Sequence, residues 1–245
     1  MTYSLAQYQA VTEKVSSGAD MFGDKIGDVT NACNAALDHW WIPSMVKDAL
    51  RWLCQKIVGL AESFWQKIKD LLKGVAAPGY MFEYAYEWAG VRGTASTAAG
   101  ELTMPVVGVS PAWTGTAATA YSTTVAPQSS AASEVATIST QTATALTTCA
   151  AAASAFYVAV GVIIFQAVAA MTAAVIALGS LVFSLGGIAM AVGEISVSSG
   201  LVIASVSTLT ALLVAQASQM ATLHGAAVDN TAFPGGHWPR AARGL

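Results

Sequence analysis

Residues 156–178 of this 245-residue chain, FYVAVGVIIFQAVAAMTAAVIAL, contain no charged side chain. A helix over this stretch is about 34 Å long, enough to cross the roughly 30 Å hydrocarbon core of a bilayer. The aromatic residues Phe156 and Tyr157 stand at one end, and such rings favour the membrane interface. The stretch predicts a membrane-spanning helix.

The uncharged region extends well beyond this helix. No charged side chain occurs anywhere between Glu134 and Glu194. Residues 197–217 form a second, weaker candidate span, and the apolar connection before it is interrupted by Gly186, Gly187 and Gly193. A lone carboxylate is costly at the bilayer centre, so we expect Glu194 near the connection between the spans. The candidate membrane-contacting side chains are Phe156, Tyr157, Ile163, Ile164, Phe165, Leu201, Ile203 and Leu212.

Two spans with a re-entrant or loop-like connection fit this pattern best, and three short passes are the alternative. A buried, alanine-rich core helix of a soluble bundle also lacks charge. However, the uncharged stretch from Glu134 to Glu194 is long for a core segment. Membrane insertion is therefore the favoured interpretation.

The composition limits the possible function classes. Hydrophobic residues make up 55% of the chain and charged residues 10%, and the mean hydropathy is +0.56. A soluble domain carries about 25% charge. The net charge of −3 excludes a large basic surface for nucleic acid. Residues 1–73 hold eight acidic and eight basic side chains, whereas all of residues 74–245 hold only nine charges, so a boundary separates a water-soluble part from a lipid-compatible part.

Two helices are expected in the charged part, at residues 4–37 and 44–73, with a corner between them. The second is strongly amphipathic, with a local charge of +3. It either packs in a bundle or lies at a membrane interface with Trp52 and Trp65 at headgroup depth. Three cysteines, without CxxC spacing, do not predict a disulfide framework; free and mostly buried thiols are expected, and a single bridge is the alternative. The first residues are too polar for a cleaved signal peptide.

Two further helices are expected at residues 80–103 and 116–155, joined by a turn at 104–112. Pro127 is expected to kink or break the second of them. Residues 218–245 are expected to form a polar, flexible tail. The chain is thus predicted to be all-α, with two helical hairpins followed by a hydrophobic helical hairpin. Its predicted segments are residues 1–79, 80–155, 156–217 and 218–245.

A distinctive motif, SPAWTGTAATAY, occupies residues 110–121. Its proline and Gly115 favour a tight connection, and Trp113 is expected to plug the open end of a helical hairpin. Ala117, Ala118 and Tyr121 are expected on one face of the following helix, where small residues permit close packing.

This motif resembles that of the Trp-x-Gly helical-hairpin family of type VII secretion substrates. Trp113 and Gly115 match the signature, and Ala117, Ala118 and Tyr121 match the small residues and the aromatic that follow it. The resemblance covers residues 80–155 and departs from the family in the added helices on both sides. The Tyr-x-x-x-Asp/Glu export signal that often follows the second helix is absent from this chain.

The resemblance implies paired hairpins in a four-helix bundle. We hypothesise that the first hairpin, residues 4–37 with 44–73, supplies the second pair of helices of such a bundle within this chain. Longer relatives with hydrophobic segments are linked to membrane permeabilisation, so the resemblance also implies export and action on a membrane. It suggests a helical secretion partner or self-association.

No HExxH, GxSxG, CxxC or P-loop sequence is present, so we assign no catalytic, cofactor-binding or metal-binding residues and do not expect an enzyme. The favoured hypothesis is an exported helical protein that inserts in or permeabilises a membrane, forming a pore or an anchor. The alternatives are a resident membrane accessory or docking protein of a secretion machine, and a soluble secretion substrate with an alanine-rich core. Membrane lipid is the expected partner, nucleic acid is not, and the expected location is the membrane or the cell envelope.

Overall fold

The computed structural model describes residues 5–103, 113–179, 185–215 and 217–240. The described residues contain helices and no strand, so the predicted all-α class is confirmed. The helices are α1 (Leu5–Leu37), α2 (Ser44–Leu72), α3 (Ala77–Glu101), α4 (Thr116–Gly179), α5 (Leu185–Ala215) and α6 (Ala217–Val228), followed by the short 3₁₀ helix η1 (Pro234–Gly236).

Helix α4 differs most from the sequence prediction. It is one continuous helix of 64 residues that includes Pro127 and passes through the predicted boundary between residues 155 and 156. Proline removes only one backbone donor, and the alanine-rich sequence on both sides favours the helix. Of the expected kink or break at Pro127, the break is therefore wrong. The expected tail is also partly wrong, because its first residues form α6.

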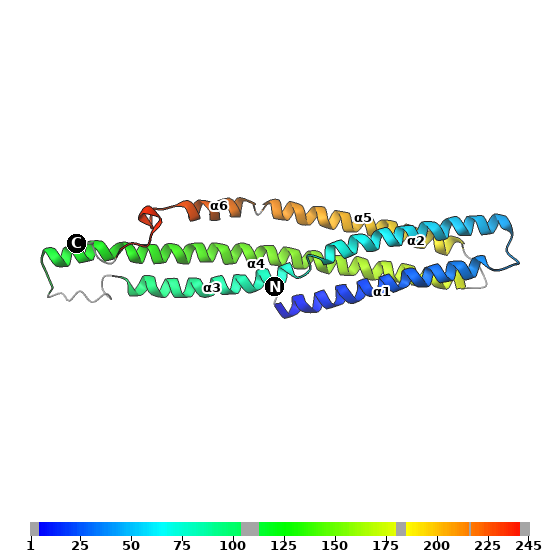
Figure 1. Cartoon of the computed structure of the whole chain (residues 1–245), viewed down its shortest axis with the longest axis horizontal. Coiled ribbons are helices and arrows are strands. Elements are labelled where there is room, and N and C mark those ends of the chain that lie inside the picture. The colour runs from blue at the N-terminus through cyan, green and yellow to red at the C-terminus, as the bar shows by residue number, and fades with distance from the viewer. Residues whose placement is uncertain (1–4, 104–112, 180–184, 216, 241–245) are drawn as a thin grey trace. The chain divides into compact units, whose positions relative to one another are not determined.

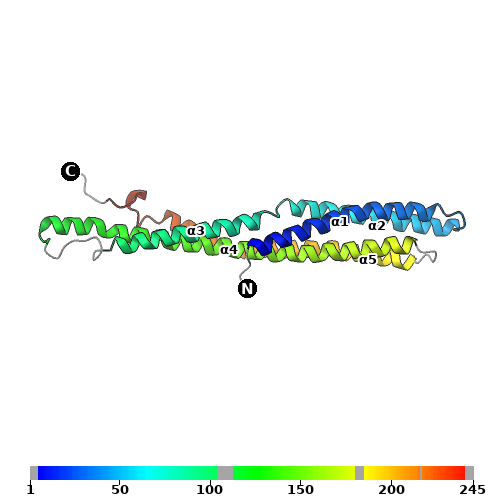
Figure 2. The same cartoon turned by 90° about the horizontal axis from the view of Figure 1, so that it is seen from below.

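The chain forms two compact units. Unit 1 comprises residues 1–79 and 151–212, and unit 2 comprises residues 80–150 and 213–245. The apolar segment thus shares a unit with the N-terminal hairpin, whereas the sequence predicts that this hairpin pairs with the Trp-x-Gly hairpin. Figures 1 and 2 show the C-terminal part of α4 and α5 running alongside α1 and α2.

Within unit 1, α1 and α2 form an antiparallel hairpin with its own core. The rings of Phe22 and Phe64 meet edge to face with their centroids 4.9 Å apart. Leu50, Ile57 and Ile68 of α2 are fully buried. These residues belong to the three- and four-residue spacing of apolar side chains along α2, so the amphipathic pattern of the sequence is realised in packing.

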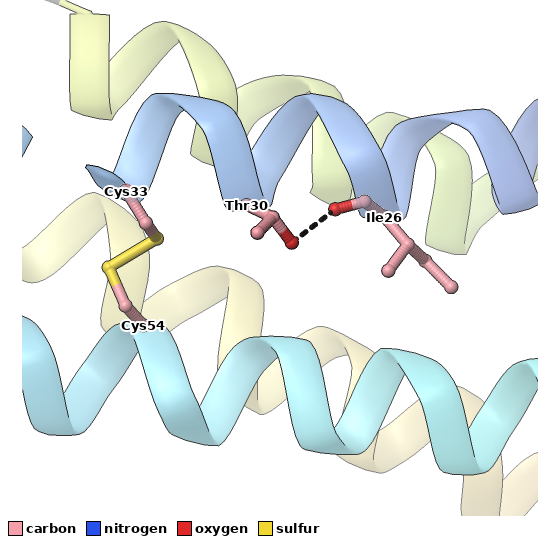
Figure 3. Close-up of a disulfide and its surroundings, with 4 residues drawn as sticks. All are labelled: Ile26, Thr30, Cys33 and Cys54. Carbon is pink, nitrogen blue, oxygen red and sulfur yellow. Dashed lines mark hydrogen bonds between the residues drawn. A yellow bond between two sulfur atoms is a disulfide. The ribbon is translucent and has the colours of Figure 1, made fainter. Parts of the chain in front are cut away.

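A disulfide joins α1 to α2 through Cys33 and Cys54, whose Cα atoms lie 6.0 Å apart (Figure 3). The expectation of free thiols is therefore wrong for these two residues. It failed because a 21-residue separation has no diagnostic spacing, and only the hairpin register brings the two helix faces together. Cys149 is free, as expected.

Unit 2 is built on small residues. Ser129 Oγ donates to the Ala99 carbonyl oxygen at 2.8 Å and ties α3 to α4. Gln128 Nε2, which is buried, donates to the carbonyl oxygen of Pro239 at 3.0 Å and holds the residues after η1 against α4. The unit buries mainly alanine: Ala85, Ala95, Ala99, Ala118, Ala131, Ala132 and Ala150. Alanine permits a close approach of helices with little apolar area buried per residue.

Candidate membrane-inserting surface

One face of α4 in unit 1 is buried at regular three- and four-residue spacing. Its members are Phe156, Tyr157, Val160, Ile163, Ile164, Ala167, Met171, Ala174 and Leu178. Four of the predicted membrane-contacting residues therefore point into the unit, which corrects the expectation that Phe156 and Tyr157 lie at an interface in this state. We name this set the inner face.

The inner face approaches α1 closely at two glycines. A methyl group placed on Gly18 of α1 would lie 3.2 Å from Cγ2 of Ile164, and one placed on Gly161 of α4 would lie 3.1 Å from Cγ2 of Val15. Both separations are tighter than an ordinary van der Waals contact. Each helix thus offers a glycine to a branched side chain of the other, which allows close helix packing. By sequence alone, Gly18 would only weaken its helix. Its position one turn after Val15 is the sequence feature that could have indicated this close packing.

Two tyrosines, Tyr8 of α1 and Tyr157 of α4, form hydrogen bonds with the chain around the end of α2. Tyr157 Oη donates to the carbonyl oxygen of Leu71 at 2.9 Å, and Tyr8 Oη donates to the carbonyl oxygen of Val75. The two rings lie 6.4 Å apart in an edge arrangement. Burial raises the pKa of the Tyr8 phenol above its ordinary value, although its hydrogen bond with Thr12 acts in the opposite direction. These contacts satisfy carbonyl groups where α2 ends, so they connect the end of the hairpin to the apolar helix.

The opposite side of α4 and α5 is apolar and exposed. We name this set the outer face: Val158, Val162, Phe165, Ile176, Val197, Leu201, Ile203 and Val206. Phe165, Leu201 and Ile203 were predicted as membrane-contacting residues, and the side chain of Leu212 lies outside the described residues. Residues 151–179 carry no charge, and residues 185–212 carry only Glu194. Large apolar side chains exposed in such number are typical of an interaction surface.

Helix α5 is held to unit 1 by a narrow strip. Of its described side chains, Ile195, Ser198 and Val202 are buried. The Ser198 hydroxyl is buried without a hydrogen-bond partner among the described residues. Such a group weakens packing by about 1–3 kcal/mol. Glu194, which was expected near the connection between the spans, lies inside α5, which begins at Leu185, and is exposed.

The charges of unit 1 lie mainly on the hairpin. Three ion pairs join residues three apart on exposed faces: Lys25–Asp28, Asp48–Arg51 and Asp70–Lys73. Exposed pairs of this kind contribute about 0–1 kcal/mol each, so they mark a hydrated surface more than they stabilise it. Trp65 lies under the ammonium of Lys69 and packs toward Gly23, whereas Trp52 is exposed. Unit 1 is therefore polar along the hairpin and apolar along α4 and α5.

The Trp-x-Gly residues in unit 2 are only partly as expected. Trp113 is 44% exposed and packs on the Tyr121 ring at 5.5 Å, so it does not plug a core. Gly115 has φ of +106°, a conformation that side chains disfavour, which explains glycine before α4. Of the two following alanines, Ala118 is buried and Ala117 is exposed. The predicted turn at residues 104–112 lies outside the described residues.

Among the described residues, no three His, Cys, Asp or Glu side chains are placed to hold a metal ion. Within the part of the chain that the structure describes, two helical segments qualify as membrane spans by length and composition: α4 and Val192–Ala211 of α5. The core helix of a soluble protein passes the same test when it is mostly buried. Of the 18-residue apolar stretch that meets the test, 44% is buried in α4 and 17% is buried in α5.

Comparison of the chain with protein families, with characterised proteins and with solved structures gives no match. Function therefore has to be inferred from the residues and their geometry.

Proposed function

We propose that this chain is a helical protein associated with type VII secretion, exported to the cell envelope, where it inserts α4 and α5 into a membrane. The observation that carries the proposal is the exposed outer face, on parts of α4 and α5 whose only charge in unit 1 is Glu194. It is exposed to water in the folded chain, and in a bilayer it would be covered by acyl chains.

The proposed mechanism exchanges one apolar partner for another. In water the hairpin α1–α2 covers the inner face, and the outer face stays exposed. In a bilayer, lipid covers both faces of α4, whose C-terminal part is apolar all around, as expected for a membrane helix. Removing apolar surface from water contributes about 25 cal/mol per Å² and drives the exchange. Association of inserted α4–α5 pairs through their small residues would then form a pore or an anchor.

The location outside the cytoplasm is supported by the Cys33–Cys54 disulfide, because such bonds persist mainly in oxidising compartments. Assignment to the Trp-x-Gly class is supported by the glycine conformation at Gly115 and by the Trp113–Tyr121 contact at the start of α4. Export is tested by comparing the chain in culture filtrate from hosts with and without an active type VII system. Secretion that does not depend on the system would refute this assignment.

The decisive test of membrane action uses Val162→Asp. Val162 is 54% exposed, so the change is tolerated in the water-soluble fold. An aspartate at the centre of an inserted helix opposes insertion by about 3 kcal/mol, roughly a 150-fold loss in the inserted fraction. Val91→Asp on α3, at 42% exposure, is the matched control.

Carbonate extraction and dye release from vesicles measure the result. The wild type and Val91→Asp should resist extraction and release dye, whereas Val162→Asp should do neither. Equal insertion of both variants would refute the assignment of α4. Intact vesicles with a soluble wild-type chain would favour the soluble secretion substrate. Recovery in the cell membrane without export would favour a resident accessory protein.

A further inference from the structure

The corner, residues 38–45, comprises the connection between α1 and α2 and the first two residues of α2, and it projects large apolar side chains into solvent. Trp40 is 90% exposed and Met45 is 83% exposed, and Trp41 is also exposed. From the sequence alone these residues have no role beyond a turn. Two tryptophans in the connection and a methionine at the start of α2 are exposed together, which is unusual because such side chains are mostly buried.

The corner is an ordered part of the hairpin. Ile42 is buried and pins the connection to the core, and its backbone N–H donates to the His39 carbonyl oxygen at 3.4 Å. The His39 and Trp41 rings lie 5.6 Å apart. The Cys33–Cys54 disulfide joins the two helices close to this end. These contacts therefore hold the exposed rings in a defined position at the end of the hairpin.

The corner lies at the end of unit 1 where α4 ends and α5 begins. Figures 1 and 2 agree on this placement. By sequence, the connection between those two helices and the helix ends beside it carry no charge. One end of unit 1 thus brings the exposed corner together with the leading end of the apolar α4–α5 pair.

We propose that the corner is the part of the chain that first docks on a zwitterionic phospholipid surface; this inference rests on the proposed function. Tryptophan rings favour the headgroup level of a bilayer, and methionine adds a flexible apolar contact. The charges around the corner balance, since Asp38 and Asp48 oppose Lys47 and Arg51. Asp48 is also paired with Arg51 at 3.0 Å. Docking through this corner is driven by apolar contact and needs no anionic lipid.

Docking at the corner also sets the direction of insertion. With the corner at headgroup depth, the uncharged end of the α4–α5 pair faces the bilayer, while the charged length of the hairpin stays in water. The alternative is a side-on arrangement with α2 flat on the surface, which would place the exposed Trp52 at the interface.

The test compares the full-length wild type, the double variant Trp40→Ala/Met45→Ala and Trp52→Ala on phosphatidylcholine vesicles. Binding is measured by co-sedimentation, and insertion by carbonate extraction of the bound fraction. Each replaced side chain is exposed, so all three proteins should unfold at the same temperature. We expect about tenfold weaker binding for the double variant, wild-type binding for Trp52→Ala, and little change in about 1 M salt.

The outcomes separate the two proposals. If the wild type inserts and the double variant binds equally well, the corner proposal is wrong and membrane insertion stands. If Trp52→Ala loses as much binding as the double variant, side-on docking replaces docking at the corner. If the wild type binds through the corner but carbonate releases it, the corner proposal stands and insertion fails. A wild type that does not bind phosphatidylcholine refutes the corner proposal, and dye release from other vesicles then decides on insertion alone.

Discussion

Locking α1 to α4 should prevent the exchange from water to membrane. The contact between Val15 and Gly161 suits a designed disulfide, Val15→Cys/Gly161→Cys. A Cβ atom on residue 161 would lie 3.1 Å from Cγ2 of Val15. The sulfur of a cysteine at position 15 would lie near the present position of Cγ2. The separation therefore matches the distance of about 3 Å between the Cβ atom of one cysteine and the sulfur of the other in a disulfide. The bond should therefore form without moving either helix.

The size of the effect follows from the loop that the bond closes. The loop runs from residue 15 to residue 161, and the chain-entropy relation gives about 5 kcal/mol for a loop of about 150 residues. This lowers the equilibrium fraction of chains with α1 separated from α4 more than about a thousandfold. Because the bond is covalent, the oxidised chain also cannot release the inner face of α4 at this contact.

Dye release from vesicles, followed over time, measures the exchange. The variant is made with Cys149→Ser so that the designed cysteines have no third partner, and mass spectrometry verifies the bond. The oxidised variant should bind vesicles through the corner but release little dye. Reductant should restore release. The wild type with and without reductant controls for loss of the Cys33–Cys54 bond.

Rapid dye release by the oxidised, verified variant would refute the reasoning. It would mean that membrane action does not require the hairpin to leave α4. In that case the exposed α5 alone, or the outer face without unit opening, would be the active element. Failure of the reduced variant to release dye would instead point to damage by the substitutions, which the two single-cysteine variants then identify.

Three further results are expected. Trp113→Ala should lower stability by only about 0.5–1.5 kcal/mol in urea unfolding, because the exposed ring loses its contact with Tyr121 and leaves no cavity; a loss above about 3 kcal/mol would mean that the ring is buried. Cys33→Ser/Cys54→Ser should lower the unfolding free energy by about 3 kcal/mol, and an unchanged urea midpoint would contradict a stabilising disulfide. The raised pKa of Tyr8 favours the neutral phenol in the folded chain, so its stabilisation is complete below about pH 10 and is lost as the pH rises through the folded pKa. Tyr8→Phe should reduce this dependence in thermal melts at alkaline pH, and an identical slope would contradict it.

The sequence predicted the elements better than their partners. The apolar period of α2 and the proline before it identified the helix almost to the residue, because local spacing and the starting proline carry that information. The partner of α4 was harder to predict. An alanine-rich helix that is apolar all around has no distinct face, and so its sequence does not tell which side meets the hairpin. The inner face became visible only from contacts such as Gly18 with Ile164.

The same limit applies to the disulfide and the corner. Cys33 and Cys54 pair because two helices align in one register, a tertiary property that the spacing of cysteines does not encode. Trp40 and Met45 have the composition of core residues, and a short connection between helices gives no periodicity from which burial follows. For the outer face, Leu201 and Ile203, which composition predicted as membrane-span residues, are exposed on α5, and their contact with a membrane stays a prediction.

The architecture of unit 1 gives the hairpin a role after release as well as before it. Its internal contacts, Phe22 against Phe64 and the Cys33–Cys54 bond, join α1 to α2 directly. We therefore expect α1 and α2 to stay packed together after release from α4, while the α1 surface around Val15 and Gly18 becomes exposed. An amphipathic hairpin with a newly exposed apolar side and a basic α2 then suits the membrane interface. In the proposed mechanism, α2 packs in unit 1 while the corner docks, and it reaches the membrane interface only after the hairpin has left α4.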